Sequence, residues 1–216
     1  MKTRRNLIKN AKLRHSKFSN VIDYYYVKTI SYGLYTDIKD YSKVRVRYKN
    51  NRRTYTTKET NSKSSFSLQR ARQKVFQLAE ANRHAHRTRK SKPVFFTLTT
   101  RDQIKDYKIS NKKIKGFIRR LNKYCGYPIK YLIVPELHGS GAIHYHGIFF
   151  NLPFIPVVEF KERIWTHGYV DLQMPKNIRS ISAYIAKYIT KDFHENTPIN
   201  TKLYFCSRGL ISPTVK

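Results

Sequence analysis

Acidic residues are scarce in this chain. Its 216 residues include 13 Asp and Glu against 44 Lys and Arg, which gives a formal net charge of +31 at pH 7. Such a charge does not specify a fold, but it indicates a polyanionic partner. The chain also carries 17 Tyr and 12 Phe. Aromatic rings among cations suit single-stranded nucleic acid, because its bases stack on them.

Cysteine and long apolar runs are also lacking. Cys125 and Cys206 are too few for a disulfide framework, and they lack the paired spacing of a zinc site. No apolar run is long enough to span a bilayer, and no hydrophobic segment of signal-peptide type follows the basic start. No basic amphipathic helix with a broad apolar face is evident, so nucleic acid is favoured over a membrane surface. We expect a cytoplasmic protein.

The larger part of the excess positive charge lies in residues 1–92, which we interpret as a basic N-terminal extension. Residues 1–20 lack periodicity and suggest an arm. Alternation in residues 43–48, followed by a polar turn, predicts a hairpin over 43–57. Helical spacing of apolar residues predicts a helix over 65–85. The basic side chains expected to contact DNA phosphates in this extension are Lys43, Arg45, Arg47, Arg52, Arg53 and Arg70.

The character of the sequence changes after Pro93, and residues 93–216 are expected to form the catalytic core. Apolar, β-prone runs predict strands, and helical spacing predicts helices between them. The expected strands are 94–100, 130–138, 142–150 and 168–172, and the expected helices are 111–124, 178–191 and a short one ending at 160–165. The fold class is therefore α+β, an antiparallel sheet with flanking helices.

One of these strands carries His144 and His146. Side chains two apart on a strand point the same way, so both imidazoles project from one face. Glu136 lies on the preceding strand and can supply an oxygen ligand on that face, and His138, which shares its parity, is the alternative third ligand. Two nitrogens and a carboxylate leave positions open for a phosphate oxygen. The competing interpretation is an ordinary solvated sheet face.

The last expected helix carries Tyr184 and Tyr188. Their spacing of four places both hydroxyls on one helix face, with Lys187 and Lys191 in a parallel row. A phenol with a pKa near 10 is a weak nucleophile. Neighbouring ammonium groups, or a metal that polarises the phosphate, help a phenolate to attack. Taken alone, the pattern also fits an amphipathic helix with core tyrosines and solvated lysines.

These signals occur in an order that resembles HUH endonucleases, the rolling-circle replication initiators of small single-stranded DNA viruses, phages and plasmids. Residues 135–146 resemble the metal motif, and residues 95–99 are similar to the first motif of the family. Residues 184–191 resemble the tyrosine motif, and residues 205–210 are similar to a stretch that follows the core in phage-type initiators. The resemblance covers residues 93–210 and matches residues 1–92 only loosely.

The resemblance implies a core of ferredoxin-like or RRM-like topology and a divalent ion, Mg or Mn, held by His144, His146 and Glu136. It implies that Tyr188, Tyr184 or both attack single-stranded origin DNA, in some initiators a hairpin. That reaction leaves a 5′-phosphotyrosine link and a free 3′-hydroxyl, and a later 3′-hydroxyl can rejoin the strand. No nucleotide-binding Gly-rich loop is present, so unwinding and extension are assigned to a host helicase and polymerase.

Two alternatives stay open at this point. Composition alone fits a non-catalytic RNA- or DNA-binding protein, for which the His, Glu and Tyr pattern is coincidental. A transposase or relaxase would share the same chemistry and differ only in its DNA substrate. Dependence on a divalent metal separates the first alternative from an endonuclease, and the DNA substrate separates the second.

Overall fold

The computed structural model describes residues 21–33, 36–48, 65–86, 91–175, 181–189, 191–198 and 201–216. The chain divides into two compact units. One comprises residues 1–60 and 213–216, and the other comprises residues 61–212. No helix in the described part of the chain is both long and apolar enough to cross a bilayer.

The smaller unit contains an antiparallel hairpin of β1 (Val21–Ser31) and β2 (Thr36–Tyr48), with β8 (Thr214–Val215) added to β1. The strand expected over 43–48 is confirmed as part of β2. Its observed partner is the preceding strand, which alternation within 43–48 could not identify. Residues 52–57, the expected second strand of the hairpin, lie outside the described residues.

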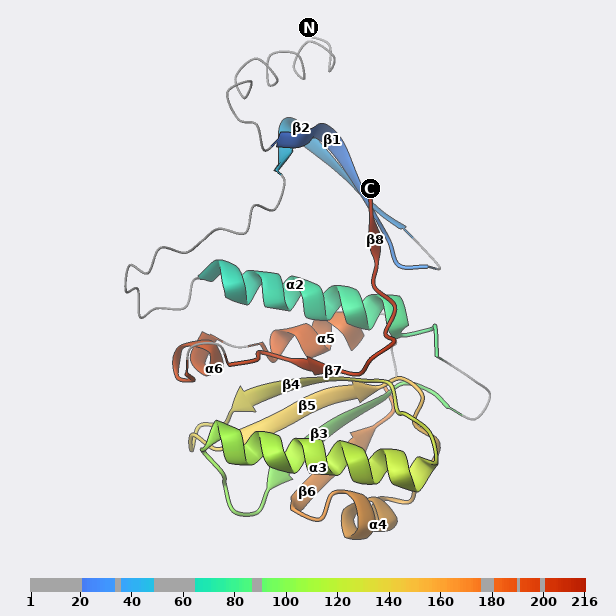
Figure 1. The fold of residues 1–216 in the computed structure, drawn as a ribbon, viewed down its shortest axis with the longest axis vertical. Coiled ribbons are helices and arrows are strands. Elements are labelled where there is room, and N and C mark those ends of the chain that lie inside the picture. The colour runs from blue at the N-terminus through green and yellow to red at the C-terminus, as the bar shows by residue number, and fades with distance from the viewer. Residues whose placement is uncertain are drawn as a thin grey trace, which may run out of the picture. The chain divides into compact units, whose positions relative to one another are not determined.

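The larger unit is built on a five-stranded antiparallel sheet, which confirms the α+β class (Figure 1). Its order is β6-β3-β5-β4-β7. The strands are β3 (Val94–Thr100), β4 (Tyr131–Leu137), β5 (Ile143–Phe149), β6 (Gly168–Gln173) and β7 (Phe205–Cys206). The expected β4–β5 hairpin is present, and its register pairs Glu136 with His144.

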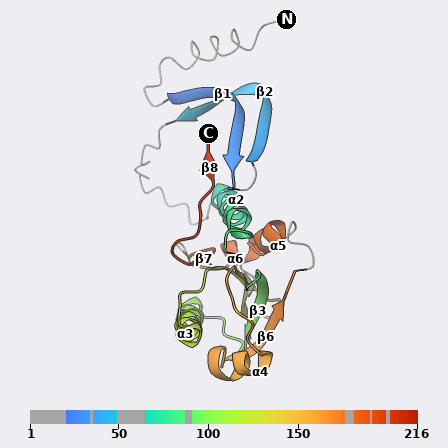
Figure 2. The ribbon, with the colours of Figure 1, turned by 90° about the vertical axis from the view of Figure 1, so that its right-hand side faces the viewer.

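Helices cover both faces of this sheet (Figures 1 and 2). On one face lies α3 (Tyr107–Cys125), with the short α4 (Val157–Glu159) and the π-helical turn η1 (Phe160–Ile164). Asp106 begins α3 by accepting a hydrogen bond from Ile109 N at 2.8 Å, and Gly126 ends it with a φ of 73°. The opposite face packs against α2 (Ser65–Asn82) and α5 (Ile181–Lys187).

The helix α2 shares a hydrophobic cluster with the sheet. Val75 and Ala79 of α2 are buried together with Val134 of β4, Ile148 of β5 and Ile185 of α5. The helix lies on the sequence side of residue 92 that was expected to form the extension, yet its apolar stripe is covered by the sheet. This packing places α2 in the same compact unit as the core strands.

The expectation of one continuous helix over 178–191 is wrong. The helix α5 ends at Lys187, and a separate short helix α6 (Lys191–Glu195) follows. The end is tightened because the Tyr188 and Ile189 amides donate to carbonyls three residues back instead of four. Arg72 Nε of α2 then donates to the Ile189 carbonyl at 2.7 Å, which satisfies an acceptor that a longer helix would have used.

Gly147 allows the core strands β3 and β5 to approach closely. A Cβ at this position would overlap the Phe96 ring and would lie 2.8 Å from the Leu132 carbonyl oxygen. We expect Gly147→Ala to lower the free energy of unfolding by roughly 1–3 kcal/mol, as overpacking of a core does. Denaturant unfolding measures this, with Gly139→Ala in the β4–β5 turn as control, because nothing lies within 4 Å of its added Cβ. Equal stability of the two variants would contradict this packing.

Candidate active site

The candidate site lies on the sheet face that carries α2 and α5. Phe95, Val134 and Ile148 on this face are buried against the helices. Because side chains alternate along a strand, the same face carries the polar residues that follow at intervals of two. These are Glu136 of β4, His144 and His146 of β5, and Thr97 and Thr99 of β3.

His146 is the centre of the polar cluster. Its ring is 7% exposed, and its Nε2 lies 2.8 Å from Glu136 Oε2. Its Nδ1 lies 3.2 Å from the Thr97 hydroxyl. With Nε2 donating to the carboxylate, a neutral ring accepts the threonine hydroxyl at Nδ1. The two contacts fix the orientation of the ring from both sides.

His144 lies beside it and has the same kind of support. Its Nδ1 is 3.5 Å from the Thr99 hydroxyl, and the His138 ring stacks on it with centroids 4.7 Å apart. Burial, followed by the neighbouring His138 and His146 rings, lowers the pKa of His144 below its usual value. The imidazole is therefore neutral at pH 7, which is the form that binds metals.

The donor set of Glu136, His144 and His146 suits a divalent metal in chemistry. Each imidazole has a threonine hydroxyl at Nδ1, and such partners orient metal-ligating histidines. Among the residues that the structure describes, no three His, Cys, Asp or Glu side chains converge as a preformed metal site. The Glu136 carboxylate instead contacts the His146 ring directly, so an ion would compete with that hydrogen bond for the same two atoms.

Tyr188 lies directly over this cluster. Its ring stacks on His146 with centroids 3.6 Å apart and an interplanar angle of 14°. Its hydroxyl donates to the Tyr184 hydroxyl oxygen at 2.8 Å. Burial, the hydrogen bond with Tyr184 and the negative charge of Glu136 all raise the pKa of Tyr188. The phenol is therefore protonated until a positive charge compensates for these effects.

Tyr184 and Lys187 form the outer part of the site. Tyr184 is 41% exposed, and its ring meets Phe95 edge to face at 4.7 Å. The Lys187 ammonium lies 4.1 Å from the Tyr184 ring centroid and 5.0 Å from that of Tyr188. Both tyrosines and Lys187 are thus brought together as expected, whereas Lys191 begins α6 and does not continue their row.

The basic residues expected to contact DNA divide between the two units. Lys43, Arg45 and Arg47 lie on β2, and Arg45 is exposed with its guanidinium 4.9 Å from the Tyr41 ring centroid. Arg70 is an exposed residue of α2 in the larger unit. Arg52 and Arg53 lie outside the described residues. DNA contact by any of these six residues stays a prediction.

Three residues of this face were not identified from the sequence. Thr97 and Thr99 pair with His146 and His144, and Asp171 of β6 pairs with Thr97 from the other side. Strand parity within residues 95–99 and 168–172 carried the signal. It could not be used without the register between strands that are distant in sequence.

Residues 93–193 match the model of a family of replication-associated proteins, the ORF2 type. The match includes the whole cluster of Glu136, His144, His146, Tyr184 and Tyr188. No curated protein and no solved structure matches the chain. The family match supports a role as a replication initiator.

Proposed function

We propose that the protein initiates DNA replication by nicking single-stranded origin DNA with a tyrosine nucleophile. The observation that carries this proposal is the position of Tyr188, whose ring lies on His146 while His146 is bound to Glu136. A phenol, an imidazole pair and a carboxylate then share one partly exposed face. Phosphoryl transfer to a protein side chain needs this combination of a nucleophile and a site for a cation.

A divalent Mg or Mn ion held by Glu136, His144 and His146 would polarise the scissile phosphate. Tyr188 Oη forms a bond to phosphorus, and the bond from phosphorus to the 3′ oxygen breaks. The phenolic proton leaves Tyr188, and the departing 3′ oxygen gains a proton to become a free hydroxyl. The products are a 5′-phosphotyrosine and a 3′ end that a polymerase can extend. The reverse attack by a 3′-hydroxyl rejoins the strand.

Neighbouring side chains assist this step in the proposal. The Tyr184 oxygen accepts the hydrogen bond from Tyr188, so it is placed to receive or relay the phenolic proton. The Lys187 ammonium near both rings favours phenolate over phenol and attracts the DNA phosphate. Tyr184 is also a second candidate nucleophile, because the hydrogen bond places both hydroxyls at the same location.

The test is a covalent-adduct assay. The protein is incubated with labelled single-stranded DNA carrying its own origin, with Mn²⁺ or with chelator, and is then denatured. We expect a protein–DNA adduct that survives denaturation and forms only with metal. Tight binding without nick or adduct on that DNA would contradict the proposal and favour a non-catalytic binding protein. Cleavage of element ends in preference to an origin would instead indicate transposition.

A further inference from the structure

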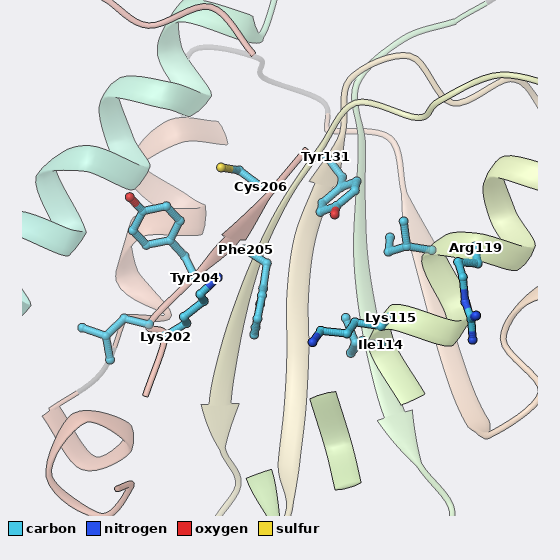
Figure 3. A pocket seen from close by; sticks show the side chains of 10 residues that line it. Ile114, Lys115, Arg119, Tyr131, Lys202, Tyr204, Phe205 and Cys206 are labelled. Atoms are coloured by element: carbon cyan, nitrogen blue, oxygen red, sulfur yellow. The ribbon is translucent and has the colours of Figure 1, made fainter. Parts of the chain in front are cut away.

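A second hollow lies on the opposite side of the sheet, away from His146 and Tyr188. It opens between α3 and the edge strand β7, and it has a volume of about 670 Å³ (Figure 3). An adjoining hollow of about 540 Å³ runs along α3, and the two share Lys115 and Arg119. We call the two hollows together the α3–β7 groove.

Positive charge lines this groove at a regular spacing. Lys108, Lys112, Lys115 and Arg119 follow one another on α3 at intervals of four, three and four residues, which places them on one side of the helix. All four are exposed, and Lys202 adds a cation from the segment before β7. Among the described residues that line the two hollows, none is acidic. The spacing suits a chain of phosphates rather than a single anion.

The other wall of the groove is aromatic. Tyr131 of β4 and Phe205 of β7 are half-buried and pack at the edge of the core that underlies α3. In Figure 3 the Lys115 side chain extends from α3 toward the Phe205 ring. Unpaired bases stack on such rings, while neighbouring cations contact the backbone.

Hydrogen bonds hold this wall in place. Tyr107 of α3 donates its hydroxyl to the Lys202 carbonyl at 2.9 Å. On the other side of β7, the Tyr131 amide donates to the Ser207 hydroxyl and the Ser207 amide donates to the Tyr131 carbonyl, each at 3.0 Å. The segment 202–207 is thus tied to α3 at one end and to β4 at the other, so the groove is formed before any ligand binds.

We propose that the α3–β7 groove binds a segment of single-stranded DNA, with phosphates along Lys108, Lys112, Lys115 and Arg119 and a base against Phe205 and Tyr131. The choice of single-stranded DNA rests on the proposed function, but binding here requires neither metal nor nicking. Because the groove and the candidate active site occupy opposite faces of the sheet, the groove holds DNA that flanks the cleaved phosphate. It therefore contributes affinity rather than chemistry.

The test is the salt dependence of binding to a fluorescent single-stranded oligodeoxythymidylate, measured by anisotropy with chelator present. Each phosphate contact contributes about 0.7 to the slope of log affinity against log salt. For the double variant Lys115→Ala/Arg119→Ala we expect the slope to fall by about 1.4, and affinity at 0.1 M salt to fall by roughly 25-fold. Thermal unfolding checks that this exposed pair does not alter the fold.

The matched control is Lys161→Ala/Arg163→Ala, which removes the same charge from exposed positions on η1. An equal loss in the control would show that only net charge matters and would overturn the proposal. Equal competition by duplex DNA would also overturn it, because stacked base pairs cannot use the aromatic wall.

A second measurement locates the DNA directly. An oligonucleotide containing bromodeoxyuridine is cross-linked by ultraviolet light to the Tyr184→Phe/Tyr188→Phe variant, and the modified peptides are identified by mass spectrometry. We expect cross-links at Tyr131 or Phe205. Cross-links confined to residues on the face of His146 would overturn the groove proposal and leave the proposed nicking function intact, whereas failure of the adduct assay would leave binding in the groove measurable.

Discussion

Replacement of Tyr188 by Phe is expected to abolish covalent adduct formation, with a fall in the nicking rate on the order of 10⁴-fold or more, as loss of a nucleophile produces. The substitution removes one oxygen and keeps the ring that stacks on His146 at 3.6 Å. Binding of uncleaved DNA should therefore change little. Quantification of adduct on denaturing gels in the presence of Mn²⁺ measures the effect.

Tyr184→Phe distinguishes one nucleophile from two. It removes the acceptor of the Tyr188 hydrogen bond, so a proton-relay role predicts slower nicking with an adduct still formed. Tyr127→Phe is the control, because this exposed tyrosine lies after α3 and its hydroxyl donates to the Asn151 carbonyl. A full-strength adduct in Tyr188→Phe that disappears in Tyr184→Phe would reverse the assignment of the nucleophile.

Glu136→Gln is expected to lower Mn²⁺ affinity by about 100-fold or more and to reduce nicking in parallel. The amide keeps an oxygen that can accept from His146 Nε2 but lacks the negative charge that a divalent ion needs. Loss of partners that only orient metal ligands already costs about 10–100-fold, and we expect that smaller effect for Thr97→Val. Isothermal titration with Mn²⁺ measures binding independently of activity.

Glu162→Gln on η1 is the control for this change, since it makes the same chemical substitution at an exposed position. If Glu136→Gln binds Mn²⁺ as the wild type does, Glu136 is not a ligand and the ion must be sought elsewhere. Wild-type affinity in Thr97→Val would show that its 3.2 Å contact with His146 is structural rather than functional.

Local patterns in the sequence were sufficient to predict the strands around the candidate site. Alternation in residues 130–150 and the turn at 139–141 predicted the hairpin that places Glu136 opposite His144. That pairing is local, so the turn alone determines its register. Residues 43–48 show the limit of the same reasoning, because alternation predicts a strand but not which neighbour it pairs with.

Features that depend on distant contacts could not be predicted. The end of α5 is set by Arg72 of α2, which is 117 residues away from Ile189 in sequence. Thr97 contacts His146 across 49 residues, and no spacing within either strand reveals it. The stacking of Tyr188 on His146 likewise requires the three-dimensional fold, although both residues were selected from their local patterns.

The sheet face that carries His146 is covered by helices from opposite ends of the larger unit, α2 before the strands and α5 after them. During synthesis, the strands bearing Glu136 and His146 leave the ribosome before residues 181–189 exist. A partly made chain therefore presents the proposed cation-binding groups without the proposed nucleophile, and its apolar surface is open on that side until Ile185 and Ile189 arrive. Under the proposed function, the capacity to cut DNA is acquired only when the same segment that seals the core brings Tyr188 into position, so an unfinished chain would be unable to damage DNA.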